Sequence, residues 1–181
     1  MPSASFQPIL DAALADYANQ IGIDPTKHPS ADRLQACHSP DDVLKLLEEK
    51  ANEFKDYRDG NRKLIDCLKP VVNVIHAFSG VLGGAVSFVP FQPAGAIFAG
   101  VDILLAAASN VSSSYDALVD LFECIGNFLK RLRIYTDLPL APSMTDVVVK
   151  IMVELLSVLA LATKQTKQGR FSEWVLVFDA R

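Results

Sequence analysis

Apolar residues recur along most of this chain at alternating steps of four and three. This spacing puts them on one face of an α-helix, which turns once every 3.6 residues. One series runs Leu64, Leu68, Val71, Ile75, Phe78, Leu82, Ala85, Val89, and a second runs Ile97, Val101, Leu104, Ala108, Val111, Tyr115, Leu118, Phe122, Ile125, Leu129, Leu132. Only residues 170–181 leave open a choice between a short helix and a strand. The pattern predicts an all-α chain.

The second series passes through Ser112, Ser113 and Ser114 without changing phase. Each serine costs only about 0.5 kcal/mol of helix propensity. Ser113 and Asp116 are also spaced as the capping box of a new helix, but the unbroken phase favours one helix of roughly 40 residues, about 60 Å long. A compact chain of this size is only about 40 Å wide. We therefore predict an elongated antiparallel bundle of about four long helices plus short ones.

Start and stop signals divide the rest of the chain. Gly22 is placed to end a first helix, and Ser39 with Pro40 is placed to begin another, which Asp59-Gly60 would end. Two proline-containing segments, 89–93 and 136–142, predict turns. The last long helix, after Ser143, is apolar almost all round and is expected in the middle of the bundle.

Composition places limits on the protein class. The 181 residues fit one domain, 1–181, of which about 170–181 are a candidate linker. A net charge of −4 without a basic stripe argues against a nucleic-acid partner. The three cysteines are widely spaced, and the N-terminus lacks the basic start and apolar run of a signal peptide. These features predict a cytoplasmic protein.

Sequence motifs for chemistry are missing their essential residues. Gly95 and Gly100 have the glycine spacing of a phosphate-binding loop, but Val101-Asp102 stands where lysine and serine or threonine are required. Cys37-His38 could supply two zinc ligands, yet no second pair stands at ligand spacing. We expect neither a catalytic site nor a metal or cofactor site, and hence a protein that binds or signals.

A segment without charged residues is the most unusual feature. Asp102 is the only Asp, Glu, Lys or Arg between Lys69 and Asp116. The charge-free residues 71–101 predict a helical hairpin whose arms each supply roughly 20 apolar residues, close to the thickness of a bilayer core. Its candidate membrane or partner contacts are Leu82, Phe88, Val89, Phe91 and Phe98.

Two interpretations of this hairpin remain open. Either it is sheltered at rest and later meets a membrane or another copy, or its arms are simply inner helices of the bundle. A small basic cluster, Lys130, Arg131 and Arg133, is a second candidate contact with lipid, although exposed helix edges often carry such clusters.

Several segments together resemble a known family. They are Phe6–Tyr17, Ile23–Pro29, Cys37–Asp41, Leu68–Val71, Ile97–Gly100, Ser113–Asp116, Leu121-Phe122, Phe128–Arg131 and Lys150–Glu154. In order and spacing they resemble the Goodbye domain at the N-terminus of fungal STAND proteins, which are counterparts of NOD-like immune receptors. The resemblance covers roughly residues 6–170.

The resemblance implies a role and a set of partners. It implies an effector module that precedes an NTPase domain and a repeat array, and that is similar in placement to HeLo-type domains. By this resemblance the module would self-associate in a programmed cell-death or heterokaryon-incompatibility response and associate with a lipid membrane on activation. The alternative is an adaptor that recruits a protein partner through a helical surface. The family supplies no catalytic residue to look for.

Overall fold

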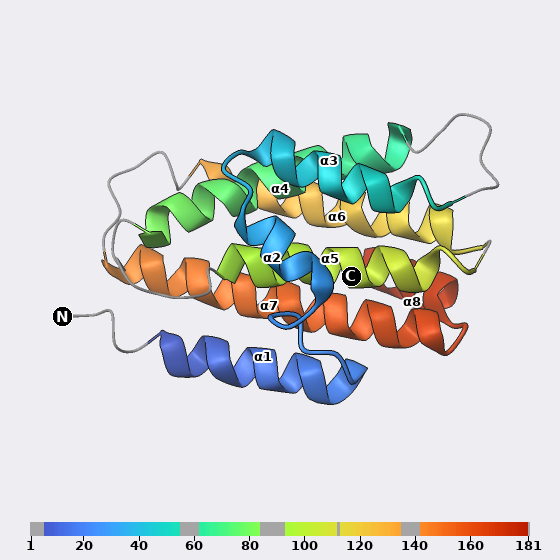
Figure 1. Cartoon of the computed structure of the whole chain (residues 1–181), viewed down its shortest axis with the longest axis horizontal. Coiled ribbons are helices and arrows are strands. Elements are labelled where there is room, and N and C mark those ends of the chain that lie inside the picture. The colour runs from blue at the N-terminus through green and yellow to red at the C-terminus, as the bar shows by residue number, and fades with distance from the viewer. Residues whose placement is uncertain (1–5, 55–61, 84–92, 112, 135–141, 181) are drawn as a thin grey trace.

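The computed structural model describes residues 6–54, 62–83, 93–111, 113–134 and 142–180. Within these ranges the chain forms eight helices and no strand (Figure 1). They are α1 (Gln7–Ile21), α2 (Pro29–Gln35), α3 (Pro40–Ala51), α4 (Arg62–Gly83), α5 (Pro93–Ala108), α6 (Ser114–Arg133), α7 (Pro142–Lys167) and α8 (Phe171–Asp179). The all-α prediction is confirmed for these parts of the chain, and the undecided C-terminal segment is helical.

The long helices lie in two layers, one formed by α4 and α6 and the other by α5 and α7 (Figure 1). Successive long helices run in opposite directions, so α4 and α6 share a direction, as do α5 and α7. Helices that follow one another in sequence are thus antiparallel, whereas the two pairs with the most extensive packing, α4 with α6 and α5 with α7, are parallel. α1 packs on α7, α2 and α3 cover α5, and α8 lies against both α6 and α7.

The predicted helix of roughly 40 residues is wrong. α5 ends at Ala108 and α6 begins at Ser114, and the longest helix is α7, with 26 residues. At the break the Ser109 hydroxyl donates to the Ala106 carbonyl (2.9 Å), and the Ser114 N–H donates to the Val111 carbonyl (3.0 Å). Serine side chains compete with helical hydrogen bonds in this way. The apolar phase is unbroken because both helices face the same core.

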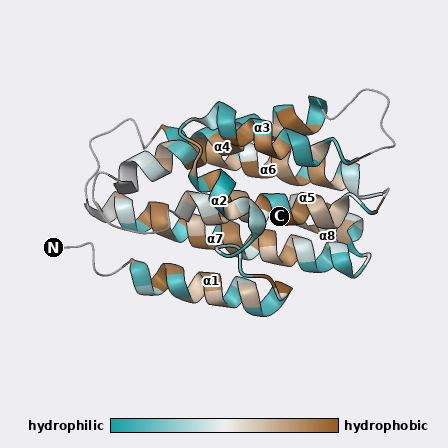
Figure 2. Ribbon diagram, viewed as in Figure 1, coloured by the Kyte–Doolittle hydropathy of each residue, from teal (hydrophilic) through white to brown (hydrophobic). Residues whose placement is uncertain are grey.

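The most buried helix is α5 and not α7. Every described α5 side chain is buried or half-buried, including that of Asp102. α7 instead carries an exposed stripe at Asp146, Lys150, Glu154, Ser157, Leu161 and Lys164. Figure 2 shows hydrophobic residues concentrated on α4, α5 and α7. The expectation that α7 lies in the middle was wrong because its few charged residues share one face.

Two of the sequence signals for helix ends are confirmed. Gly22 has a φ of 77° and ends α1, a conformation that favours glycine. The Ser39 hydroxyl accepts the Asp42 N–H (3.2 Å) at the start of α3 and donates to the Asp42 carboxylate (2.8 Å). This hydroxyl lowers the pKa of Asp42. α3, however, ends at Ala51, earlier than predicted, and Asp59-Gly60 lies outside the described residues.

Glycines let the layers approach closely at two points. A Cβ on Gly126 of α6 would lie 3.2 Å from the Pro70 ring of α4. A Cβ on Gly100 of α5 would lie 3.2 Å from Leu159 of α7 and 3.6 Å from the Tyr17 ring of α1. These contacts place Pro70 inside α4, against α6, without ending the helix.

Candidate functional site

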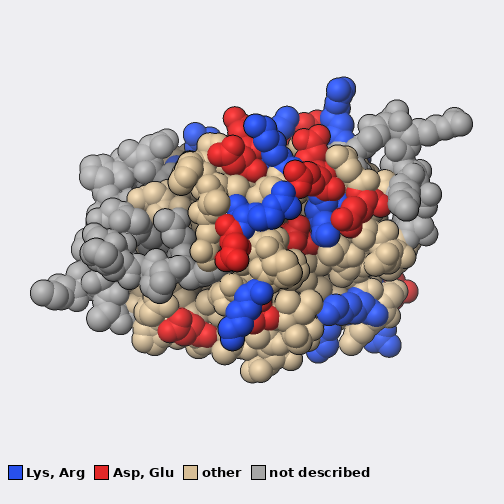
Figure 3. Space-filling view, viewed as in Figure 1, with Lys and Arg blue, Asp and Glu red and all other residues tan. Residues whose placement is uncertain are grey.

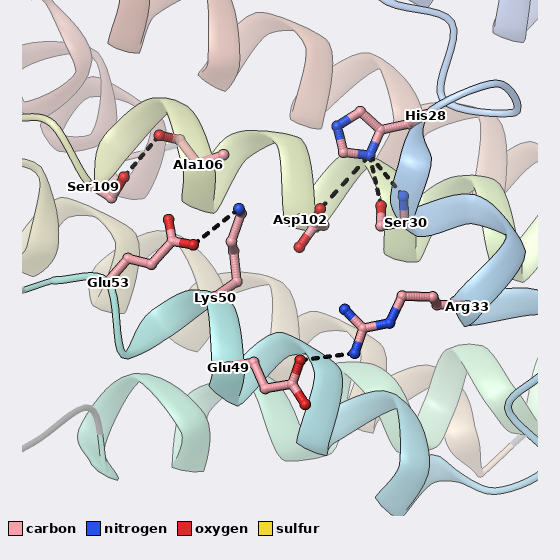
Figure 4. A network of polar contacts seen from close by, with 9 residues as sticks. All are labelled: His28, Ser30, Arg33, Glu49, Lys50, Glu53, Asp102, Ala106 and Ser109. Carbon is pink, nitrogen blue, oxygen red and sulfur yellow. Dashed lines mark hydrogen bonds and ion pairs between the residues drawn. The ribbon is translucent and has the colours of Figure 1, made fainter.

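Polar side chains gather where α2 and α3 cross α5 (Figure 4). They line a cleft of about 240 Å³ that includes His28, Arg33, Lys50 and Asp102. Asp102 is the only Asp, Glu, Lys or Arg between Lys69 and Asp116, and it is only 8% exposed. Because a buried carboxylate needs a polar partner, this cleft is the first place to look for chemistry.

The partner of Asp102 is His28, whose Nδ1 lies 3.7 Å from the carboxylate. The same Nδ1 accepts the Ser30 N–H at 3.3 Å and lies 2.6 Å from the Ser30 hydroxyl. His28 therefore caps α2 with an unprotonated Nδ1. In this state the ring cannot donate from Nδ1 to Asp102.

This geometry differs from a catalytic serine–histidine–aspartate relay. A relay places serine and aspartate on opposite ring nitrogens, whereas Figure 4 shows all contacts of His28 converging on Nδ1. The arrangement places the capping residue of α2 beside the buried carboxylate of α5. His28 is therefore not placed to pass a proton from Ser30 to Asp102.

The remaining charges of the cleft are paired with each other. Arg33 binds Glu49 at 2.8 Å, and Lys50 binds Glu53 at 3.1 Å. Figure 3 shows acidic and basic side chains interspersed on this face of the molecule. Exposed pairs of this kind contribute at most about 1 kcal/mol each. Of the two pairs, Arg33–Glu49 joins α2 to α3, whereas Lys50–Glu53 is local to the end of α3.

A second cleft, of about 360 Å³, contains Cys37, His38 and His76. Burial, followed by the nearby charge of Asp42, raises the pKa of the Cys37 thiol. A thiol with a raised pKa is a poor nucleophile, since the thiolate is the reactive form. Among the described residues no group of three or more His, Cys, Asp or Glu side chains is placed to hold a metal ion.

Tyr17 is the most deeply buried polar side chain of α1, at 1% exposure. Burial raises its pKa to about 12, and the neighbouring Thr163 hydroxyl offsets part of this effect. The Thr163 hydroxyl donates to the Leu159 carbonyl (2.8 Å), and the Tyr17 hydroxyl has no hydrogen bond of good geometry. Tyr17 thus fills space between α1, α5 and α7.

The predicted hairpin contacts are placed only in part. Phe88, Val89 and Phe91 lie outside the described residues, as does the side chain of Leu82 within α4. Phe98 is 4% exposed, so it belongs to the core and not to a surface tip. α5, at 16 residues, is shorter than the predicted arm. No helix in the described ranges has both the length and the apolar character needed to cross a membrane.

The predicted basic cluster is on the surface. Lys130, Arg131 and Arg133 are exposed in the last turn of α6. Phe128 and Ile134 beside them are 52% and 71% exposed. The basic residues were visible in the sequence. The signal for the exposure of Phe128 and Ile134 is that both lie off the apolar series through Ile125, Leu129 and Leu132.

α8 carries a second exposed apolar surface that the sequence pattern did not indicate. Leu176 is 71% exposed and Val177 57%, while Phe171 and Val175 of the same helix are buried. Trp174 stacks between Phe171 and Phe178, with ring centroids 6.1 and 5.2 Å away. The apolar run 174–178 hides which residues face out, since it shows no periodicity.

Comparisons with known proteins give one positive result. No curated protein matches the chain, and neither does any solved structure. The family model described as the fungal STAND N-terminal Goodbye domain matches residues 10–135, which extend from α1 to just past the end of α6. This match spans more than half of the chain, and the chain belongs to the Goodbye domain family of fungal STAND proteins.

Proposed function

We propose that this domain is a non-catalytic effector module, which acts when its parent STAND protein brings copies together and which then contacts a membrane. Family membership supports its place as an N-terminal module of a fungal STAND protein. In the described residues the polar side chains of the cleft pair with one another, as Arg33 does with Glu49, and have no relay geometry, which favours signalling over catalysis.

The observation that carries the membrane part is the gathering of two features at one end of the bundle. α4 ends and α5 begins there, so the two arms of the charge-free segment 71–101 meet this end of the bundle (Figure 1). α6 ends there too, with its basic cluster and the exposed Phe128 and Ile134. Apolar residues beside cations suit the interface of an anionic membrane.

The resting structure keeps most of the described hairpin covered. Val71, Ile75 and Phe78 of α4 are buried, as are residues 94–105 of α5. α2, α3 and α7 all pack on α5. Membrane contact by the hairpin arms therefore requires these covering helices to move, which clustering would promote if it stabilises the open state.

Leakage of anionic vesicles is the direct test. The domain, fused to a helical oligomer, is added to vesicles that contain a self-quenched dye. We expect dye release by the fused domain and much less by the unfused domain. Phe91→Glu should abolish dye release, because a charge in the turn that the sequence predicts at residues 89–93 opposes entry into lipid.

Phe171→Glu is the control that shows what loss of structure looks like. Phe171 is buried in α8, so this change should unfold part of the bundle and alter the far-UV spectrum. Phe91→Glu should leave that spectrum unchanged. Absence of any leakage by the clustered, folded wild-type domain would refute the membrane proposal.

The exposed α8 surface favours a second candidate, an adaptor that binds a protein partner. Leu176 and Val177 form an apolar surface on a helix that begins at the opposite end of the bundle, where Ser172 donates to the Ser113 carbonyl (3.1 Å). Helical partners bind such faces through apolar anchors. Leu176→Asp should abolish binding of the protein partner and leave vesicle leakage unchanged. Phe91→Glu should abolish vesicle leakage and leave partner binding unchanged.

A further inference from the structure

The exposed strip of α6 has its charges sorted by sign. Asp116, Asp120 and Glu123 occupy its first half, and Lys130 and Arg131 its second half, with Asn127 between them. Steps of four and three residues keep these side chains on one helix face. All six are exposed. This set is called the α6 strip below.

The charges of the α6 strip have no opposite partners in the described chain. None of its five charged residues forms an ion pair with a described side chain. Neighbouring carboxylates at steps of four and three repel one another. On α4, which packs on α6, Asp66 is paired with Lys69 at 3.2 Å. Burial raises the pKa of the Cys67 thiol of α4, the nearby charges of Glu123 and Asp120 add to this effect, and Lys63 opposes it.

The helix dipole accounts for only part of this arrangement. Acidic residues in the first turn and basic residues in the last turn are stabilised by the dipole. Asp116 and the two cations meet that condition. Asp120 and Glu123 lie beyond the first turn, where the effect of the dipole has faded. The like charges of Asp120 and Glu123 are therefore not explained by the dipole of α6.

We propose that the α6 strip binds the same strip of a second copy, with the two α6 helices antiparallel about a two-fold axis near Asn127. A two-fold operation brings Glu123 of each copy onto the basic half of the other, while Asp116 and Asp120 lie farther from the axis than the cations do. The same patch is then used on both subunits, as a two-fold interface requires.

The spacing of the residues fits this pairing. Glu123 and Arg131 lie four residues on either side of Asn127, so an antiparallel copy centred there places each Glu123 opposite an Arg131. The span between them is about 12 Å along the helix. Lys130, one residue away, reaches the same carboxylate. The interface uses one helix per copy, which predicts a weak, salt-sensitive dimer.

This inference goes beyond the proposed function, since it concerns how two copies meet and not what they do to a membrane. It is tested with two charge-reversed chains. In the first, Asp120→Lys and Glu123→Lys make the strip basic except at Asp116. In the second, Lys130→Glu and Arg131→Glu make it acidic throughout. All replaced residues are exposed, so both chains should keep the wild-type far-UV spectrum and melting temperature within a few degrees.

Sedimentation velocity at low salt gives the readout. We expect wild-type chains to dimerise with a Kd of roughly 1 mM or below, each reversed chain alone to dimerise at least tenfold more weakly, and an equimolar mixture of the two to form a heterodimer. Added salt should dissociate both the wild-type dimer and the heterodimer.

Three results would overturn the pairing. They are a wild-type chain that stays monomeric up to about 1 mM, a reversed chain that dimerises as the wild type does, and a mixture that fails to associate. If the wild type is monomeric and only the Lys130→Glu, Arg131→Glu chain loses sedimentation with anionic vesicles, the strip serves lipid contact instead. Vesicle leakage can fail without any effect on these results.

Discussion

At the scale of single residues, the buried polar groups of this bundle differ in how they are accommodated. Asp102 lies under α2, with its carboxylate 3.7 Å from Nδ1 of His28, the residue that caps that helix. Thr163 and Thr166 of α7 are buried and donate to carbonyls one turn earlier, both at 2.8 Å. Tyr17 differs, because its hydroxyl is buried without a hydrogen bond of good geometry. Its ionisation is therefore a sensitive probe of the folded state.

Tyr17 predicts a loss of stability at alkaline pH. Its pKa is about 12 in the folded chain, compared with about 10 in an unfolded chain. Between these values the unfolded chain gives up a proton that the folded chain retains, so the free energy of unfolding falls as pH rises. At pH 11.5 this loss reaches about 2 kcal/mol, and at pH 9 it is absent.

Urea unfolding of wild type and Tyr17→Phe at both pH values isolates this contribution. At pH 9 the substitution should change the free energy of unfolding by less than about 1 kcal/mol, because the lost hydroxyl had no strong partner. At pH 11.5 the variant should be the more stable of the two by about 2 kcal/mol relative to that baseline. Equal pH dependence of the two proteins would show that Tyr17 ionises freely.

At the scale of helices, the sequence predicted those helix ends that depend on neighbouring residues. Ser39 and Pro40 begin α3, and Gly22 ends α1, because caps and left-handed turns depend on neighbouring residues. The hairpin segment 71–101 is largely core in its described parts, one of the two interpretations that the sequence left open.

Features that depend on tertiary packing were not predicted. The unbroken apolar phase across Ser112–Ser114 predicted one continuous helix. That prediction was wrong because periodicity shows which face of a helix is buried and does not show whether the chain reverses direction between two helices. The parallel pairs α4–α6 and α5–α7 join helices that are distant in sequence. Of the candidate contacts, Lys130, Arg131 and Arg133 are exposed and Phe98 is buried, since the exposure of Phe98 depends on which helices cover α5. Contact of the basic cluster with lipid stays a prediction.

The close approach of α4 and α6 predicts opposite effects for one substitution at two sites. Gly80 of α4 has open space where a Cβ would lie, so Gly80→Ala should raise the free energy of unfolding by about 0.5–1 kcal/mol through helix propensity. At Gly126 the new Cβ meets the rigid Pro70 ring at 3.2 Å. Gly126→Ala should therefore lower stability by roughly 1 kcal/mol or more, despite the same gain in propensity.

Thermal and urea unfolding of both alanine variants test this comparison. Matched chemistry at the two positions removes the contribution of intrinsic propensity from the difference between them. If Gly126→Ala were as stabilising as Gly80→Ala, the layers would have room to separate at this point, and the packing of Pro70 against α6 would be loose.

At the scale of the whole molecule, the packed bundle extends beyond the family match. The match ends at residue 135, before α7 begins. Yet α7 packs extensively on α5 and α1, and it buries Val148, Val149, Met152, Leu155, Leu156, Leu159, Ala160 and Ala162. Without α7 the inner helix α5 would expose the face that makes it the most buried helix.

Truncation at two points measures this dependence. A chain that ends at Gly169 keeps α7 and loses only α8, with its buried Phe171 and Val175, so it should unfold cooperatively at a lower temperature, weakened by roughly 3–6 kcal/mol. A chain that ends at residue 135 loses the α5 and α1 contacts as well, and should show no cooperative thermal transition by circular dichroism. A cooperative transition in this shorter chain, near that of the full chain, would mean that residues 10–135 fold alone and that α7 is an addition to their core.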